Sequence, residues 1–147
     1  MPAPGIALMN PYHLRDSARN KWRGEVEDAA ENRFERFQSV EASTRAFLVI
    51  LNHYKEGGKR TFADIFERYA PAADNNDPES YAAFVARKLE KKVTDEPNLR
   101  DPDECLRLCQ AVIRMECGRQ PNKDPWYGDA SIAAGISWAH EDIKQWF

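Results

Sequence analysis

The sequence predicts an all-α fold, a compact single domain of about five helices with an irregular N-terminal arm. Three observations support this class. Apolar residues recur at helical spacing along several segments. Thr residues or Asp-Pro pairs stand where those segments begin, as helix-capping residues do. The length of 147 residues fits one domain that buries a core of its own.

The clearest signal is a helical hairpin between residues 61 and 89. Thr61 is the expected N-cap of the first helix, Pro71 ends that helix, and Asp77-Pro78 begins the second. The apolar faces of the two helices are Phe62, Ile65, Phe66, Tyr69, Tyr81, Phe84, Val85 and Leu89. The loop between them holds Asp74, Asn75, Asn76 and Asp77. This loop is either a solvated turn, since Asn and Asp favour turns, or one wall of a polar groove.

Composition excludes several function classes. With 42% hydrophobic and 31% charged residues, the chain has the balance of a soluble globular domain. The net charge of −3 argues against a general nucleic-acid surface, although a contact through a basic N-terminal arm stays open as a weaker alternative. No apolar run approaches the roughly 18 residues of a membrane span. The first residues lack the order of a signal peptide, so synthesis in a cytoplasm is expected.

The three cysteines, Cys105, Cys109 and Cys117, do not predict a disulfide framework. Their number is odd, and two of them lie four residues apart on one expected helix. Their spacing differs from C-x-x-C and no histidine lies close to them in sequence, so no metal site is predicted. We expect buried, reduced thiols on a helix face, and no cofactor.

Charge and proline content divide the chain into three parts. Residues 1–24 form the expected extended arm, residues 25–118 the helical core, and residues 119–147 a loop and a C-terminal helix. Residues 15–23 carry a charge of +3, whereas residues 25–41 carry −4. These two stretches pair with each other, dock on different partners, or form a solvated surface.

Three more helices are expected, over residues 41–55, 101–117 and 131–147. The first has an apolar stripe and ends at two glycines. The second begins at Asp101-Pro102, and Glu104 is expected to complete its capping box. The third is rich in aromatic residues, which either cap the core or provide a docking face. His140 on this helix is expected to be a core histidine.

Glu116 is placed unusually for a carboxylate. It lies eleven residues after Cys105, about 20° around the helix, so it continues the apolar stripe of residues 105–113. Burial and the helix C-terminus both raise a carboxyl pKa, as a general acid in glycosidic cleavage requires. The alternative is a structural glutamate that pairs with Arg15, Arg114 or Arg119, or that reaches solvent.

The loop of residues 119–130 brings Trp126 and Tyr127 close to this helix end in sequence. Aromatic rings beside a carboxylate suit stacking on sugars. They suit a plug of the core or a protein contact equally well.

Several motifs follow one another in a characteristic order. Residues 10–15 match an opening Asn-Pro-Gly-Asn-Ile-Arg in part, and a Trp-x-Gly and a Phe-x-x-Phe follow at Trp22 and Phe34. Arg45-Ala46, Ala70-Pro71, a loop Asn at Asn75, a Tyr at Tyr81, an Asp-Pro cap at Asp101 and Ile-x-x-Glu-x-Gly at residues 113–118 complete the series. In this order and spacing the chain resembles a family of small phage and prophage proteins. These are described as virion structural proteins of lysozyme-like, peptidoglycan-acting ancestry.

The resemblance implies a lysozyme-like helical core and a virion-associated protein that binds, and in one version cleaves, peptidoglycan. In the cleaving version, a glycosidase or lytic transglycosylase, Glu116 is the general acid and Asp74 or Asp77 the second carboxylate. Asn10 and Asn75 would contact sugar. Tyr81, Trp126 and Tyr127 would form the walls.

The chain departs from the pattern where Tyr12-His13 replaces Gly-Asn and Tyr69 replaces Trp. Glycine permits backbone conformations that Tyr does not, so the N-terminal turn is expected to differ. The rival function is therefore non-catalytic: a structural protein of the particle, present as an oligomer of repeated copies, or a protein that binds a host factor.

Overall fold

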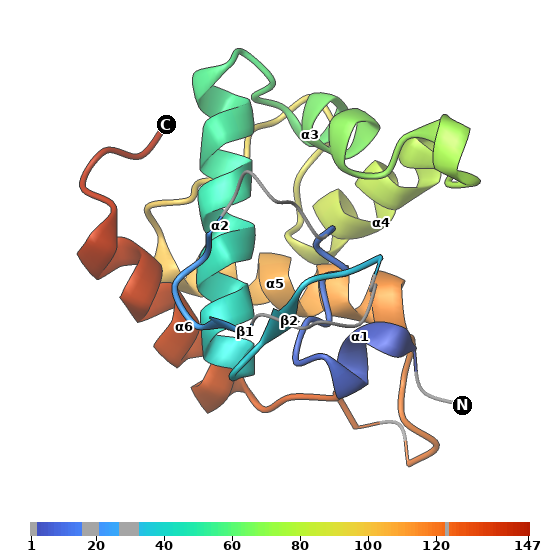
Figure 1. Cartoon of the computed structure of the whole chain (residues 1–147). Helices are drawn as coiled ribbons and strands as arrows, with labels where there is room; N and C mark the ends of the chain where they lie inside the picture. Colours follow the sequence, from blue (N-terminus) through green and yellow to red (C-terminus); the bar gives the residue numbers. More distant parts are fainter. Residues whose placement is uncertain (1–2, 16–20, 27–32, 123) are drawn as a thin grey trace.

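Helices make up most of the computed structural model, which describes residues 3–15, 21–26, 33–122 and 124–147 (Figure 1). The α-helices are α1 (Pro4–Ala7), α2 (Val40–Glu56), α3 (Phe62–Tyr69), α4 (Pro78–Lys88), α5 (Pro102–Cys117) and α6 (Asp129–Asp142). The other elements are the 3₁₀ helix η1 (Ala72–Asp74) and the short strands β1 (Glu25–Val26) and β2 (Arg36–Phe37). The predicted all-α class is therefore confirmed.

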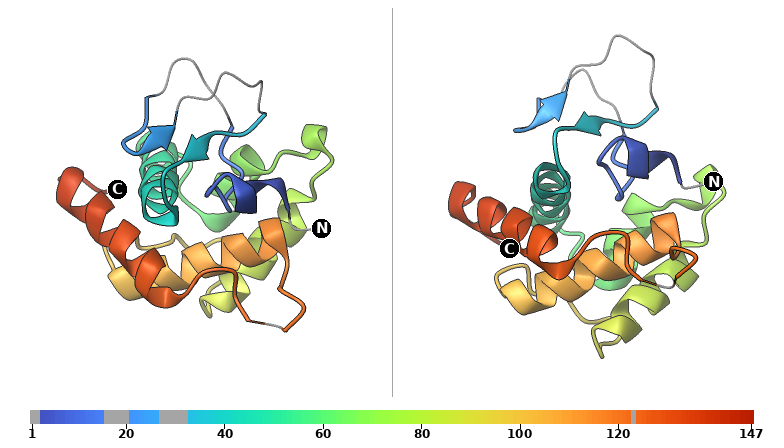
Figure 2. Two further views of the ribbon diagram at one scale, coloured as in Figure 1. Left: turned by 60° about the horizontal axis from the view of Figure 1, so that its bottom comes forward. Right: turned by 90° about the horizontal axis from the view of Figure 1, so that it is seen from below.

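Helix α2 lies between two groups of elements (Figure 2). On one side are α1 and the β1–β2 pair, and on the other are α5 and α6. Helix α6 packs along α2 so closely that a Cβ atom on Gly135 would lie 2.6 Å from the carbonyl oxygen of Glu41. Helices α3 and α4 pack on each other and form the predicted hairpin.

The helix starts confirm the predicted caps, with one exception. Side chains of three N-cap residues accept a backbone N–H of the first turn at 3.0–3.1 Å: Thr61, Asp77 and Asp101. Glu104 does not complete a capping box, because its buried carboxylate binds elsewhere. It accepts hydrogen bonds from Lys91 Nζ at 2.9 Å and from the backbone N–H of Asn98. The ion pair with Lys91 offsets the cost of burying this carboxylate. A hydrogen bond back to the Asp101 N–H, as in a capping box, would not supply an opposite charge.

The last helix is shorter than predicted. It starts at Asp129 rather than at residue 131 and ends at Asp142 rather than at residue 147. The side chain of Asn52 on α2 binds the segment beyond it, donating to the Gln145 carbonyl at 3.0 Å and accepting from the Phe147 N–H at 2.8 Å. Trp146 consequently packs into the core. Of the two alternatives for the aromatic residues of this segment, capping the core or forming a docking face, Trp146 follows the first.

The N-terminal segment differs most from expectation. Instead of extending away from the domain, it forms α1 and inserts Tyr12 and Leu14 into the core. Tyr12 is fully buried and stacks on Phe47 of α2, with ring centroids 4.5 Å apart. Its hydroxyl forms a short hydrogen bond with Thr44. A proline-rich start therefore did not mean a free arm here.

Strands β1 and β2 were not predicted. They pair antiparallel, with Glu25 opposite Phe37 and Val26 opposite Arg36. Each has only two residues, too few for a periodic pattern, within a stretch whose acidic character dominated the prediction. The predictions for the basic stretch 15–23 and the acidic stretch 25–41 depend partly on charged residues at positions 16, 19, 27, 28 and 31. These positions lie outside the described residues.

Other predictions concern single residues. Cys105 and Cys109 are buried and all three cysteines are free thiols, as predicted. His140 is half-buried, and its Nε2 lies 2.7 Å from the Leu99 carbonyl oxygen. Among the described residues, no helix is both long and apolar enough to cross a membrane.

Candidate functional site

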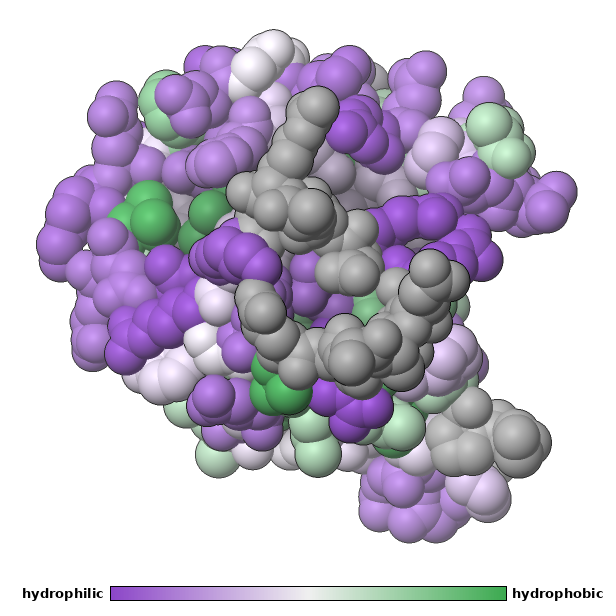
Figure 3. All heavy atoms as spheres, viewed as in Figure 1, coloured by the Kyte–Doolittle hydropathy of each residue, from purple (hydrophilic) through white to green (hydrophobic). Residues whose placement is uncertain are grey.

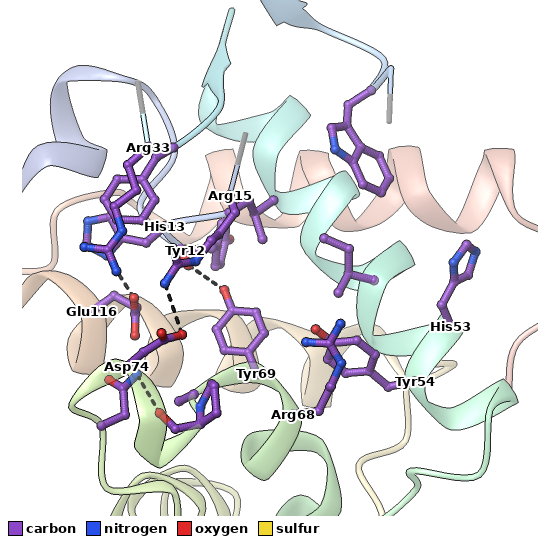
Figure 4. Close-up of a pocket in the computed structure, with 17 residues that line it drawn as sticks. Tyr12, His13, Arg15, Arg33, His53, Tyr54, Arg68, Tyr69, Asp74 and Glu116 are labelled. Atoms are coloured by element: carbon purple, nitrogen blue, oxygen red, sulfur yellow. Dashed lines mark hydrogen bonds and ion pairs between the residues drawn. The ribbon is translucent and has the colours of Figure 1, made fainter. Parts of the chain in front are cut away.

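An open cleft of about 550 Å³ lies where the N-terminal segment meets α2, α3 and the end of α5 (Figure 4). Aromatic, cationic and acidic side chains line it together: Tyr12, His13, Leu14, Arg15, Trp22, Arg33, Phe34, Ile50, His53, Tyr54, Arg68, Tyr69, Ala70, Pro71, Asp74, Asn76 and Glu116. The molecular face shown in Figure 3 is mostly hydrophilic, with hydrophobic residues in small separate spots. The lining of the cleft itself combines charged and aromatic side chains, which suits a ligand that has both polar groups and apolar faces.

The wall between the N-terminal segment and α3 depends on Tyr12. Its ring is held in the core, and its carbonyl oxygen accepts a hydrogen bond from the Tyr69 hydroxyl at 2.5 Å. Burial raises the pKa of both phenols well above the ordinary value, so both keep their protons at neutral pH. A core contact and a backbone hydrogen bond thus fix this wall at residues 12 and 69.

Glu116 lies in the cleft at the C-terminal end of α5, with its side chain 18% exposed. One carboxylate oxygen, Oε1, is 2.9 Å from Nδ1 of His13. The other, Oε2, accepts a hydrogen bond of 2.9 Å from the Tyr81 hydroxyl. Glu116 was expected to continue the buried stripe, and it lies at the edge of the core with its partners His13 and Tyr81 instead of an arginine.

The protonation of His13 follows from its other contact. Its Nε2 lies 3.1 Å from the backbone nitrogen of Gly5, and that N–H can only donate. Nε2 must therefore carry the lone pair, which leaves the proton of the neutral ring on Nδ1. Nδ1–H donates to Glu116, so His13 connects α1 to the end of α5.

The hydrogen bonds of Glu116 bear on what its carboxyl group can do. Both oxygens accept hydrogen bonds, from His13 and from Tyr81. Burial, and then the charge of Glu116, raise the pKa of the Tyr81 hydroxyl, which therefore stays a donor. A general acid instead needs a proton of its own directed at the leaving oxygen. The geometry favours a carboxylate that holds the cleft wall in place.

Asp74 shares the cleft with Glu116 (Figure 4). Its Oδ2 lies 3.1 Å from Nη2 of Arg15, and both side chains are substantially exposed. Arg15 is one of the three arginines that the sequence suggested as partners of Glu116. Of the two candidates for the second carboxylate, Asp74 is the one that the fold brings into the cleft.

Asp77 and Asn75 have local roles outside the cleft lining. Asp77 caps α4, and hydrogen bonds from the backbone N–H and the hydroxyl of Ser80 lower its pKa below the ordinary value. Asn75 ends η1 in the left-handed region at φ 63°, which Asn tolerates better than most residues. The loop thus combines both expectations, since Asp74 and Asn76 face the cleft while Asn75 and Asp77 shape the turn.

Asn10 is fully buried instead of facing a ligand. Its amide nitrogen donates to the carbonyls of Leu14 and Glu35, each at 2.9 Å, and its oxygen accepts from the Leu14 N–H at 3.0 Å. All three hydrogen bonds are internal, so Asn10 fixes the turn that carries residues 12–15. Tyr81 is also buried, and reaches the cleft only through Glu116.

Trp126 and Tyr127 lie away from the cleft lining. The Trp126 indole N–H donates to the backbone carbonyls of Cys117 and Gly118, at the point where α5 ends. Tyr127 reaches the other side of the N-terminal segment, with its hydroxyl 3.4 Å from the Ile6 carbonyl. Trp126 borders a smaller pocket of about 360 Å³ with Gln110, Ile113 and Arg114 among its residues. These two aromatic residues support α5 and do not form walls around Glu116.

Sequence reasoning missed the cationic residues of the cleft. Arg33 lies over the ring of Phe34 and Arg68 over the ring of Tyr54, at 5.4 and 5.5 Å from the ring centroids. Both arginines lie close to other charged residues in the sequence. The one usable signal was that Arg68 precedes Tyr69, the last residue of the apolar stripe of α3.

Among the described residues, no group of three or more His, Cys, Asp or Glu side chains could hold a metal ion. No protein-family model and no curated protein sequence matches this chain.

Proposed function

We propose that the protein is a phage virion-associated protein that binds host peptidoglycan glycan strands in this cleft without cleaving them. One observation carries the proposal: residues from five separate family-like motifs line the same cleft. They are Tyr12–Arg15, Trp22, Phe34, Ala70–Pro71 and Glu116. Motifs that are far apart in sequence and meet at one surface support a common binding role there.

The chemistry of the cleft suits a glycan strand. The Trp22 ring offers an apolar face to a sugar ring, and Asn76 and His53 offer polar groups to hydroxyl and amide groups. The cleft is open, as a polymer requires. Its volume of about 550 Å³ falls within the range of ordinary ligand sites.

Binding is favoured over cleavage because of what replaces Gly-Asn of the motif. Tyr12 fills the core, and His13 donates to the carboxylate that would otherwise be the acid. With the Tyr81 hydrogen bond on the second oxygen, Glu116 has become part of the wall. In this proposal, the replacement of Gly-Asn by Tyr12-His13 thus also explains why Glu116 does not act as an acid.

Co-sedimentation with purified sacculi tests the proposal. The wild type should sediment with sacculi, and Trp22→Ala should reduce the bound fraction. Trp138→Ala is a matched control, because Trp138 is also half-buried but lies outside the cleft lining. Circular dichroism should show both variants folded.

The same samples decide between binding and cleavage. We expect no soluble muropeptides from the wild type or from Glu116→Gln. Release by the wild type alone would make the protein an enzyme with Glu116 as its acid. If the wild type neither sediments nor releases fragments, the rival function as a structural or host-factor-binding protein replaces the proposal.

A further inference from the structure

The cleft is cationic on a chain that is acidic overall. Among the residues that the structure describes, three arginines and two carboxylates line it, a formal charge of +1, whereas the whole chain carries −3. Low-dielectric walls focus such a local charge and attract ligands of opposite sign.

The two carboxylates are already engaged within the protein. Asp74 pairs with Arg15 at 3.1 Å, and Glu116 accepts hydrogen bonds from His13 and Tyr81. Neither is left to attract a cation. Arg15 and His13 are engaged in these contacts, so we do not count them among the groups available to a ligand.

Arg33 and Arg68 remain. Within the described part of the chain, neither guanidinium forms an ion pair, and each is held over an aromatic ring. A guanidinium whose charge interacts with a ring face can still donate two N–H groups to a carboxylate in a bidentate bond. Figure 4 shows the two arginines on opposite sides of Tyr69, so they suit a ligand with anionic groups some distance apart.

We propose that the cleft selects carboxylated glycans, with Arg33 and Arg68 pairing with their carboxylates; this rests on the proposed function. The carboxylate comes either from a lactyl group on the sugar ring or from a peptide attached to it. A neutral glycan lacks both, so the inference predicts discrimination between anionic and neutral sugars.

Affinity measurements with three small probes test this inference on the full chain. The probes are N-acetylmuramic acid with a lactyl carboxylate, muramyl dipeptide with a peptide carboxylate, and neutral diacetylchitobiose. At low salt, at least one anionic probe should bind about tenfold more tightly than the neutral one. The anionic probe that binds identifies the source of the carboxylate.

Three variants assign the effect to the cleft. Each anionic probe has one carboxylate, so Arg33→Gln or Arg68→Gln, whichever arginine pairs with it, should remove most of the preference for that probe. Arg87→Gln should keep it, because Arg87 also lies over a ring, that of Phe84 at 6.0 Å, but outside the cleft lining. This control has the same chemistry in another place.

The outcomes separate this inference from the proposed function. Equal affinity for all three probes, unchanged in the arginine variants, overturns the inference and leaves glycan binding standing. Sacculus binding with no probe bound and no loss in Arg33→Gln or Arg68→Gln does the same. If neither sacculi nor probes bind, both ideas fail. Binding of an oligonucleotide that Arg68→Gln abolishes would assign the cleft to phosphates instead.

Discussion

The helical part of the molecule, residues 40–142, and its N-terminal segment are held in place in different ways. Helices α2 to α6 bury apolar faces against one another, so their stability is spread over many side chains. The N-terminal segment has two core anchors, Tyr12 and Leu14. Beyond those, it depends on individual hydrogen bonds of Asn10, His13 and the Tyr12 carbonyl.

The cleft lies on the boundary between these two regions. One wall comes from stable helices, and the other from a segment that single polar contacts hold. Substitutions in the helices should therefore change the global stability, whereas substitutions in the segment should change the cleft first.

Phe66→Ala should have the largest effect. Phe66 is fully buried in the helical part and stacks on Tyr81, with ring centroids 4.9 Å apart. Removing a buried phenyl ring leaves a cavity and should lower the free energy of unfolding by about 3–5 kcal/mol. Urea denaturation measures the loss. The half-buried Phe84, changed to Ala, should cost less, and equal losses would show that burial does not set stability here.

Asn10→Ala should have the next largest effect. It leaves the Leu14 N–H and the carbonyls of Leu14 and Glu35 without their internal partner, which costs about 1–3 kcal/mol. Hydrogen exchange should rise mainly in residues 8–15, and sacculus binding should fall. Gln38→Ala, which removes an exposed amide outside the cleft lining, is the control. Exchange that rises evenly along the chain would contradict a locally held segment.

Alkaline pH should weaken the fold through thiols of α5, one in the core and one that contacts the N-terminal segment. Burial raises the pKa of Cys105 in the core and of Cys117 near the N-terminal segment to about 12, from an ordinary value of 9.0. Below pH 9 both thiols are neutral whether the chain is folded or unfolded. Between about pH 9 and 12 these two thiols ionise only in the unfolded chain, so the free energy of unfolding falls as pH rises.

The urea midpoint should therefore be lower at pH 10.5 than at pH 8. Cys105→Ala should reduce the size of this decrease, since one raised thiol pKa is gone. A variant that loses stability with pH as steeply as the wild type would show that Cys105 does not contribute.

His13→Asn should have the smallest effect on stability. His13 has a φ of 54°, a region that Asn tolerates, so the backbone can stay as it is. The shorter side chain cannot join both Gly5 and Glu116, and we expect a loss of about 1 kcal/mol. Combined with Glu116→Gln in a double-mutant cycle, the two losses should not add. Additive losses would mean that the two residues are not coupled.

The two regions also differed in how far the sequence predicted them. Periodic apolar residues and Asp-Pro caps located α2 to α5 within one or two residues, because local interactions determine those features. The end of α6 and the position of Trp146 depend on Asn52, which is more than 90 residues away. A local pattern contains no record of such a partner.

The site shows the same division. The position of Glu116 followed from helical periodicity, and the polar loop was correctly assigned to a groove in part. Its partners His13 and Tyr81 did not follow, since the fold alone brings them together. Asn10 was chosen from the family resemblance, and Trp126 and Tyr127 for residue type, yet the side chain of each bonds to backbone groups within the fold.

The hydrogen bond between His13 and Glu116 also bears on the order of events during folding. It joins residues 103 positions apart, and the bond from Cys117 Sγ to the Pro11 carbonyl joins residues 106 apart. Contacts of such long sequence separation carry the entropy of closing a long loop and form after local ones. Helices α2 and α6 also make contacts of long separation, but they share a large apolar core, whereas the N-terminal segment has two core anchors. We therefore expect the N-terminal segment to dock last. The cleft would then exist only once the whole chain has finished folding.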